Sequence, residues 1–305
     1  MNILIVGLGS IGRRHARVIR RLRPDAFLFA LRSGRGGGSE EGVNDIMDLR
    51  DAPADLDLAV IATPTDRHRT DALAVLPRCR FLFVEKPLAL STDDGAALAM
   101  DVERAGIGSY VGCHLRFHPC LQWLRDSMPT VRPDIRGVEA VCHSWLPDWY
   151  PTLDYRQSYR STAARSGGVH LELIHELDYV TWMFGMPIRK TLALHRSPQL
   201  AIDAFSTARY ELTYGDFPAT IDLSYAERGK SVRRVDIAFD DDRWIVDLLT
   251  FRIQRKDGHI LFQSSASLES VYEAQMRHVL ACVEGKEQSL HSVREALTIL
   301  ALALP

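Results

Sequence analysis

Short apolar runs alternate with longer helical stretches along residues 2–112. The runs that predict strands lie at 3–6, 27–31, 58–62, 81–84 and 110–112. Helices are expected from the first glycines to about residue 22, over 66–76 and over 92–105. This spacing is typical of βαβ units, so about five parallel strands should form a sheet with helices on both faces.

After residue 116 the pattern changes. A helix is expected over about 119–126, a strand over about 138–144, a polar and aromatic loop over 145–166, and a helix over 168–184. Extended segments with alternating apolar and polar residues then fill 187–263, and helices close the chain over about 269–284 and 293–304. Strands grouped in this way favour a mainly antiparallel sheet.

The predicted fold class is α/β with two domains. Residues 1–116 should form a dinucleotide-binding Rossmann domain built on a doubly wound parallel sheet. Residues 117–305 should form an α+β domain for substrate binding and oligomerisation, built on a mainly antiparallel open sheet. The terminal helices, about 269–304, can pack back on the first domain. A length of 305 residues agrees, because it is about twice that of a common domain.

Charge and cysteine content exclude several classes of protein. The 37 Lys and Arg nearly balance 39 Asp and Glu, so no overall positive field attracts nucleic acid or an anionic membrane. The five cysteines are scattered without metal-ligand spacing, which predicts reduced thiols, a cytoplasmic location and no metal. No signal-peptide pattern and no run of 18 apolar residues is present, so we expect no membrane association.

The first strand runs directly into a glycine-rich turn that opens a helix. Gly7, Gly9 and Gly12 have the GxGxxG spacing, with Ser10 and Ile11 inside the motif. Such glycines allow a tight turn, a close approach of a pyrophosphate, and close packing of helix on strand, while the helix N-terminus favours the anion. A glycine turn without a ligand is the alternative, but the strand–turn–helix context favours dinucleotide binding.

The residues after the second strand bear on the choice of cofactor. An acidic residue is usual there in proteins that bind the ribose of NAD, whereas this chain has Arg32 and Ser33. Because a guanidinium binds phosphate with two hydrogen bonds, the sequence predicts a preference for NADP, with NAD possible and Arg13 or Arg35 nearby. A solvated arginine in a loop is the alternative.

Two further turns follow predicted strands at the ligand-binding edge of the sheet. Thr63, Pro64 and His68 belong to the first, and Glu85 and Lys86 precede a proline in the second. We expect all five to contribute to the cofactor site. Helix capping would also explain the first turn, and a surface ion pair would explain the second.

The segments GLGSIG, ATPT..H, VEKP, GCHLRFHP and GGVHLELIHELDYVTWMFG resemble the Gfo/Idh/MocA family of sugar and cyclitol dehydrogenases over essentially the whole chain. The aromatic segment that begins at Trp145 resembles members found with bacterial surface-sugar biosynthesis. The resemblance implies a Rossmann domain, a second domain whose open sheet serves dimers or tetramers, and oxidation of a hydroxyl by NAD(P).

The resemblance also assigns catalytic roles. It places the lysine that touches the reacting hydroxyl at Lys86 and the proton acceptor at His175. The family commonly has an aspartate four residues before that histidine, whereas this chain has Leu171 there and Glu172 one position later. The departure leaves open whether Glu172 takes the carboxylate's role, by orienting the imidazole or by pairing with Lys86.

The residues themselves support part of this assignment. If 171–184 is one helix, Glu172, His175 and Tyr179 share a face opposite an apolar stripe. Histidine suits proton transfer because its unperturbed pKa of about 6.5 lies near neutral pH. An ammonium such as that of Lys86 suits stabilisation of a developing alkoxide. A solvated polar face is the alternative.

Six residues are candidates for substrate contact: His114, Arg116, Trp149, Tyr155, Arg156 and Tyr179. Aromatic faces and charged hydrogen-bonding groups are what a sugar needs. An interdomain salt bridge is the alternative for Arg116, and an oligomer contact is the alternative for the aromatic loop.

The function predicted is hydride transfer between a nicotinamide cofactor, NADP preferred, and a hydroxyl or ketone of a sugar, nucleotide sugar or cyclitol. One alternative is a redox-assisted sugar lyase or hydrolase with a retained cofactor. The other is a non-catalytic NAD(P)-binding sensor. A homodimer or homotetramer formed through the C-terminal sheet is expected.

Overall fold

The structure is a computed structural model that describes residues 1–34, 38–150, 152–229 and 231–305. The chain divides into two compact units, and each is described by itself. Unit 1 consists of Met1–Cys113 with Tyr272–Ala301, and unit 2 of His114–Val271 with Leu302–Pro305. The separate roles predicted for 1–116 and 117–305 stay predictions. No helix in these described ranges is long and apolar enough to cross a membrane.

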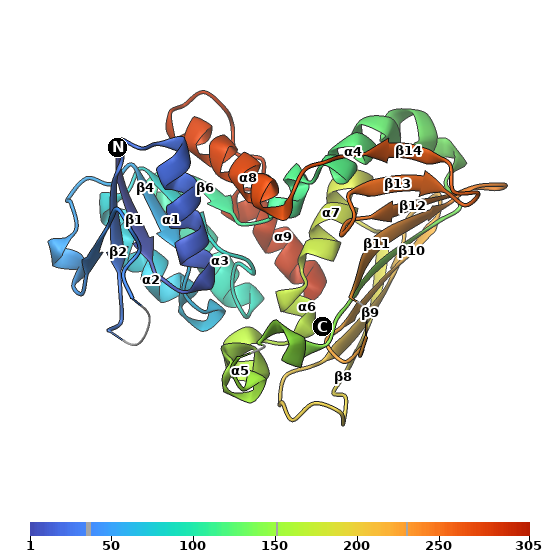
Figure 1. Cartoon of the computed structure of the whole chain (residues 1–305), viewed down its shortest axis with the longest axis horizontal. Coiled ribbons are helices and arrows are strands. Elements are labelled where there is room, and N and C mark those ends of the chain that lie inside the picture. The colour runs from blue at the N-terminus through green and yellow to red at the C-terminus, as the bar shows by residue number, and fades with distance from the viewer. Residues whose placement is uncertain (35–37, 151, 230) are drawn as a thin grey trace. The chain divides into compact units, whose positions relative to one another are not determined.

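Unit 1 is built on a six-stranded parallel sheet in the order β3-β2-β1-β4-β5-β6 (Figure 1). The strands are β1 (Asn2–Val6), β2 (Phe27–Leu31), β3 (Val43–Ile46), β4 (Leu58–Ile61), β5 (Phe81–Val84) and β6 (Gly108–Val111). The chain runs outward from β1 to β3, then returns to β4 and runs the other way. Right-handed crossovers therefore put helices on both faces, and β1 and β4 meet at the switch point where such sheets bind ligands.

Helices cover the central strands of this sheet. They are α1 (Ser10–Leu22), α2 (His68–Val75), α3 (Thr92–Ala105) and the unit 1 parts of α8 (Leu268–Val283) and α9 (Val293–Ala303), with short 3₁₀ turns η1 (Leu49–Asp51), η2 (Thr65–Arg67) and η3 (Leu76–Arg78). Every residue of β4 and β5 is buried. Both strands are continuous apolar runs, as expected for strands covered on both faces.

Unit 2 is built on an eight-stranded sheet in the order β14-β13-β12-β11-β7-β10-β9-β8 (Figure 1). The strands are β7 (Gly137–His143), β8 (Arg189–His195), β9 (Thr207–Thr213), β10 (Pro218–Ser224), β11 (Val232–Ala238), β12 (Arg243–Asp247), β13 (Arg252–Arg255) and β14 (Ile260–Gln263). All neighbours are antiparallel except β7 and β10, which are parallel. The mixed α/β fold class predicted from the sequence is confirmed.

Within the part of unit 2 that the structure describes, helices cover one face of the sheet (Figure 1). The helices are α4 (Pro119–Val131), α5 (Ala163–Ser166), α6 (Val169–Glu172) and α7 (His175–Phe184), with 3₁₀ turns η4 (His114–Phe117), η5 (Arg132–Asp134), η6 (Leu146–Trp149), η7 (Tyr155–Gln157) and η8 (Tyr159–Ser161). Burial alternates along β9, with Tyr210 and Leu212 buried and Arg209 and Glu211 exposed. Alternation of this kind marks a sheet with one face in the core and one in solvent.

Two elements differ from the sequence-based prediction. The parallel sheet has a sixth strand, β3, which the sequence analysis does not predict because Asn44 and Asp45 interrupt its apolar residues. This strand lies at the sheet edge, where polar residues are tolerated. The helix expected over 168–184 is broken between α6 and α7, since Leu173 leaves the helical region with ψ near 34°.

Candidate functional site

A pocket of about 770 Å³ lies at the carboxyl ends of β1, β2 and β4 in unit 1. Its walls are Val6, Gly7, Leu8, Gly9, Ser10, Arg13, Leu31, Arg32, Ser33, Met47, Thr63 and Arg67. The structure thus brings together six residues predicted for the cofactor site: Gly7, Gly9, Ser10, Arg32, Ser33 and Thr63.

The three glycines of the turn meet different needs. Gly7 has φ of +92°, which side chains rarely adopt. A Cβ at Gly12 would lie 2.1 Å from the Gly7 carbonyl oxygen, so only glycine lets α1 pack on the turn. A Cβ at Gly9 would meet no atom within 4 Å, so the turn is open toward the pocket. With the α1 N-terminus beginning at Ser10, this open turn fits a pyrophosphate. Ile11 and Gly12 lie in the first turn of α1.

The arginines beside the pocket are paired with carboxylates. Arg32 Nη1 lies 2.5 Å from Asp45 Oδ2 on β3, and Arg13 Nη1 lies 3.2 Å from Glu40 Oε2. Ser33 is exposed beside Arg32. Asp45 was not predicted, because its strand was missed. The fourth candidate for this end of the pocket, Arg35, lies outside the described residues.

His68 joins the two turns that follow β4 and β5. Its Nδ1 lies 2.9 Å from the Pro87 carbonyl oxygen and its Nε2 lies 2.9 Å from the Thr63 carbonyl oxygen. Burial lowers the pKa of His68, and the two carbonyl oxygens oppose that effect. With both ring nitrogens beside backbone carbonyl oxygens, His68 braces the two turns, and its contact with the cofactor stays a prediction. Pro64 is half-buried in the first turn.

Glu85 and Lys86 follow β5, and Glu85 has a partner on α1. Glu85 is 7% exposed, and its Oε1 lies 2.6 Å from Nε2 of the buried His15 on α1. The Glu85 carboxylate, which was predicted for the cofactor site, therefore contacts a side chain of α1. Lys86 is half-buried, and the Lys86–Pro87 peptide bond is cis.

In unit 2, His175 is the first residue of α7 and is 4% exposed. The His114 ring lies edge-on to it, with ring centroids 4.5 Å apart. The structure therefore brings together two residues that the sequence proposed separately, one as proton acceptor and one as substrate contact.

Glu172 lies on α6, not on the helix of His175. Its Oε2 accepts a hydrogen bond of 2.9 Å from Arg160 Nε, and Arg160 Nη1 donates to the Tyr150 hydroxyl at 2.7 Å. Burial raises the pKa of Tyr225 well above its usual range, and the Glu172 charge adds to that effect. The shared helical face inferred for Glu172 and His175 was wrong, because the helix breaks between them.

Arg116 and Asp178 form a buried ion pair inside unit 2. Arg116 Nη2 lies 2.7 Å from Asp178 Oδ1, and the two side chains are 6% and 0% exposed. Asp178 was missed by the sequence analysis, although its place three residues after His175 was a usable signal. This pair lies within unit 2, so it is not the interdomain salt bridge that was considered for Arg116.

The remaining substrate candidates are spread out. Tyr179 is fully buried on α7, and burial raises the pKa of its hydroxyl well above the usual range, with the Glu176 charge adding to the effect. That burial contradicts a role in substrate contact. Trp149 is 37% exposed and lies edge-on to Tyr225, with ring centroids 5.3 Å apart. The Tyr155 hydroxyl accepts from the Ala201 amide at 3.2 Å, and Arg156 is exposed and pairs with Asp154.

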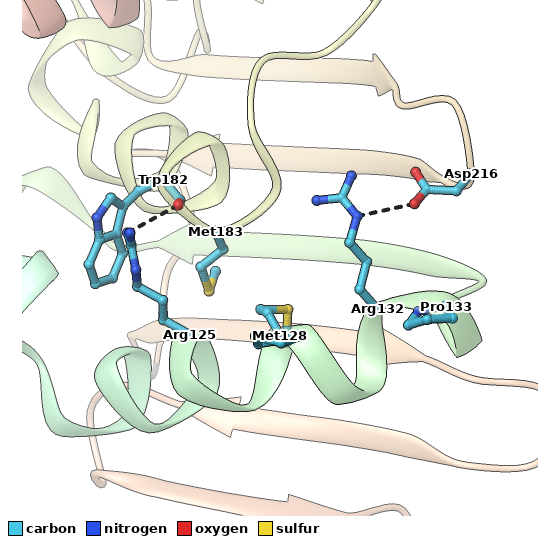
Figure 2. Close-up of a pocket in the computed structure, with 8 residues that line it drawn as sticks. Arg125, Met128, Arg132, Pro133, Trp182, Met183 and Asp216 are labelled. Atoms are coloured by element: carbon cyan, nitrogen blue, oxygen red, sulfur yellow. Dashed lines mark hydrogen bonds and ion pairs between the residues drawn. The ribbon is translucent and has the colours of Figure 1, made fainter.

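A second pocket lies in unit 2 along α4 and the end of α7 (Figure 2). The Arg125 guanidinium stacks 4.0 Å above the Trp182 ring, and Nη1 donates to the Trp182 carbonyl at 3.2 Å. Arg132 reaches across to Asp216 at 3.2 Å. None of the residues predicted from the sequence lines this pocket.

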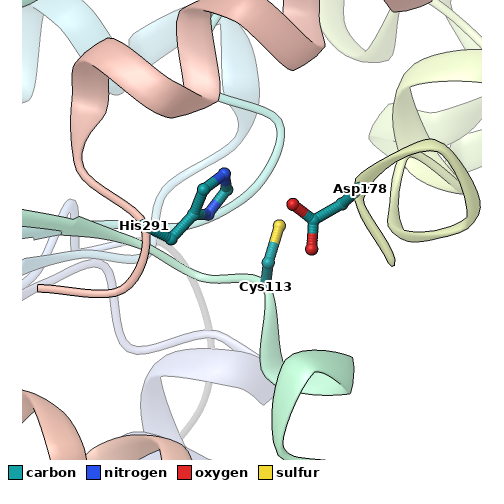
Figure 3. Close-up of side chains that lie close together, drawn as sticks. All are labelled: Cys113, Asp178 and His291. Carbon is teal, nitrogen blue, oxygen red and sulfur yellow. The ribbon is translucent and has the colours of Figure 1, made fainter. Parts of the chain in front are cut away.

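The segment before α9 is tied to β6 within unit 1. His291 Nδ1 lies 3.0 Å from the Val111 carbonyl oxygen, and the Val111 amide donates to the His291 carbonyl at 2.8 Å. Figure 3 shows His291 and Cys113, which follows β6 and is buried. These two hydrogen bonds hold the segment at 291 against the edge strand β6.

Comparisons with known proteins agree with this architecture. Residues 1–112 match the model of the oxidoreductase family with an NAD-binding Rossmann fold, GFO_IDH_MocA. Inositol 2-dehydrogenase of Rhizobium meliloti (strain 1021) is 29% identical over 189 residues, 59% of this chain and 54% of the relative. The 2,7-anhydro-N-acetylneuraminate hydratase of Escherichia coli (strain K12) is 27% identical over 130 residues, 43% of this chain and 34% of the relative.

Similarity at the level of fold extends over the whole chain. The WlbA dehydrogenase from Bordetella pertussis, solved in complex with NADH and UDP-GlcNAcA, is similar with a TM-score of 0.81. At 20% identity, the match covers 98% of this chain and 93% of that chain. The curated relatives, by contrast, are matched over about half of their length or less.

Unit 1 is therefore a Rossmann-type unit with a glycine turn at its switch point. Residues 1–112 match the model of the Gfo/Idh/MocA oxidoreductases, so the resemblance found in the sequence is confirmed.

Proposed function

We propose that this chain is an oxidoreductase that moves a hydride between a nicotinamide cofactor and a CH–OH group of a sugar, nucleotide sugar or cyclitol. The observation that carries the proposal is the unit 1 pocket, whose open glycine turn and paired arginines fit a dinucleotide. The family match and the inositol 2-dehydrogenase relative support the substrate class. Arg32 and Ser33 at one end of the pocket support NADP as the preferred form.

The chemistry divides between the residues as follows. His175 takes the hydroxyl proton of the substrate on a ring nitrogen while the carbon loses a hydride and becomes a carbonyl. A nicotinamide cofactor held by the glycine turn of unit 1 would accept that hydride. Lys86 donates a hydrogen bond to the same oxygen and stabilises its developing negative charge. Glu172 acts through Arg160 to hold α6 in place.

The roles of Lys86 and His175 are tested by Lys86→Met and His175→Asn. We expect both variants to lose turnover with a panel of sugars, measured at 340 nm, and to bind NADPH within about twofold of the parent protein. The exposed residues Lys256 and His195 provide matched controls as Lys256→Met and His195→Asn. A protein that binds neither NADPH nor NADH overturns the proposal.

A redox-assisted lyase, hydrolase or hydratase is the second candidate, favoured by the similarity to 2,7-anhydro-N-acetylneuraminate hydratase. In such a reaction the hydride returns to the substrate within one turnover. Substrate is then consumed, as followed by chromatography, with no net change at 340 nm. A net change that matches substrate consumption excludes this candidate.

A homodimer or homotetramer formed through the unit 2 sheet, in the cytoplasm, completes the proposal. Its support is the solvent-facing side of that sheet, where charges of both signs alternate. Arg209 lies 3.0 Å from Asp222, and Arg243 lies 3.2 Å from Glu139. Light scattering after size exclusion should give at least twice the mass of 34.3 kDa, and a monomer contradicts the expectation.

A further inference from the structure

Every arginine among the described residues that line the unit 1 pocket has a carboxylate partner. Arg13 pairs with Glu40 at 3.2 Å, Arg67 with Asp71 at 2.8 Å, and Arg32 with Asp45 at 2.5 Å. None of the three carboxylates is among the described residues that line the pocket. The pocket is therefore close to charge balance before any ligand enters.

The pair between Arg32 and Asp45 has a special position. Arg32 directly follows β2, and its amide donates to the Ile46 carbonyl of β3 at 3.0 Å. Asp45 precedes Ile46 and stands opposite Ala30 in the parallel register of the two strands. A Rossmann unit that binds NAD usually has an acidic residue at the end of its second strand. In this chain the carboxylate at that place comes from the neighbouring strand β3.

We propose that Asp45 is a specificity-determining residue that weakens binding of NADP relative to NAD. The inference rests on the proposed function and deepens it. Asp45 holds one side of the Arg32 guanidinium, and its negative charge lies beside the group that would receive a 2′-phosphate. Because that phosphate brings up to two further negative charges, it meets repulsion that a free ribose hydroxyl does not.

The partial exposure of the pair limits the size of the effect. The side chains of Arg32 and Asp45 are 16% and 27% exposed, so water and salt screen the repulsion only in part. Arg32 has five N–H donors, so it can bind a phosphate while it still contacts Asp45. Asp45 should therefore reduce the preference for NADP without abolishing binding.

The test is a set of direct titrations with NADPH, NADH and adenosine 2′,5′-bisphosphate, using the full chain and the variant Asp45→Asn. We expect the Kd for NADPH and for the bisphosphate to fall about tenfold, and the Kd for NADH to stay within about twofold. Asp45→Glu, which keeps the charge, should resemble the parent protein. Asp51→Asn removes the same charge from an exposed turn of unit 1 and should change neither value.

The outcomes separate two failures. If NADPH and NADH both bind and Asp45→Asn leaves their ratio unchanged, the inference is overturned while the proposed function stands. If Asp45→Asn weakens both ligands equally, the residue is structural, and the inference is again overturned. If neither nucleotide binds any of the four proteins, the proposed function itself fails. High salt should shrink the gain of Asp45→Asn, since screening acts on the same repulsion.

Discussion

The glycine turn of unit 1 and the surroundings of His175 in unit 2 are organised on different scales of sequence. The turn is made by neighbours, Gly7 to Gly12, whose backbone shapes the pocket. Around His175, the pair Arg116–Asp178 joins residues 62 positions apart, and Arg233–Glu176 joins residues 57 positions apart. A site formed by backbone therefore depends on residues that are neighbours in the sequence. A site formed by side-chain pairs depends on the fold of the whole unit.

The largest effect on stability is expected from breaking the ion pair between Arg116 and Asp178, which are distant in the sequence. Asp178→Asn removes the charge that neutralises the buried Arg116, so the free energy of unfolding should fall by about 3–5 kcal/mol. Urea titration followed by circular dichroism measures it. Asp216→Asn, in the half-exposed pair with Arg132, is the matched control and should cost at most about 1 kcal/mol. Equal losses in the two variants would contradict a special role for the buried pair.

The next largest effect is expected in the glycine turn of unit 1. In Gly12→Ala the new Cβ would lie 2.1 Å from the Gly7 carbonyl oxygen, and backbone cannot yield as a side chain can. We expect a loss of about 3 kcal/mol in stability, the upper range for overpacking. Gly9→Ala, where no atom lies within 4 Å, should change stability by less than about 0.5 kcal/mol. Thermal melting distinguishes them, and an unperturbed Gly12→Ala protein would refute the close packing.

A pH dependence follows from His118 of unit 2. Burial lowers its pKa to about 4, while the Leu248 carbonyl partly opposes the shift. Between about pH 6.5 and pH 4 the unfolded chain takes up a proton that the folded chain excludes. Stability is therefore fully present above this window and falls as pH falls through it, by about 2 kcal/mol between pH 7 and pH 5.

His118→Gln isolates that contribution. The Gln side chain can still accept from the Cys120 amide, as the imidazole Nδ1 does at 3.2 Å, but it does not titrate. Urea midpoints at pH 7 and pH 5 should therefore differ less in the variant than in the parent protein. The slope that remains is expected from His170, whose pKa is lowered to about 4 by burial alone, and from His68, whose pKa burial also lowers. An unchanged slope would show that His118 does not contribute.

The smallest effect is expected at the exposed end of the aromatic loop. Arg156 is exposed and pairs only with its neighbour Asp154 among the contacts of the described loop. Arg156→Ala should leave the melting temperature unchanged within error. If the residue contacts substrate as the sequence predicts, KM should rise with kcat nearly constant. A change in neither constant would place Arg156 outside the site.

Much of unit 1 could be predicted from the sequence, because each of its signals is short. Apolar runs mark β1, β4 and β5, which are buried on both faces, and the glycine spacing marks the turn after β1. The exception is β3, whose Asn44 and Asp45 interrupt the run at an exposed sheet edge. With β3, the sequence analysis also missed the carboxylate that pairs with Arg32.

In unit 2 the prediction of one continuous helix over 168–184 was wrong, because the helix is interrupted between α6 and α7. Placing Glu172 and His175 on one face required a continuous helix, and the break at Leu173 turns Glu172 toward Arg160 instead. Tyr179 was assigned to the substrate for the same reason. It is fully buried, because α7 is buried on nearly all sides. A helix of that kind has no polar face for a periodicity argument to find.

By itself, the sequence determined the class of fold and the dinucleotide turn, since strand burial and glycine conformations depend on residues close together in the chain. Only the tertiary structure decided which charges face one another. The pairs Arg32–Asp45, Glu172–Arg160 and Arg116–Asp178 each join different elements. The energy of an ion pair depends on the distance between the two charges and on their burial, and neither can be read from the spacing of residues along the chain.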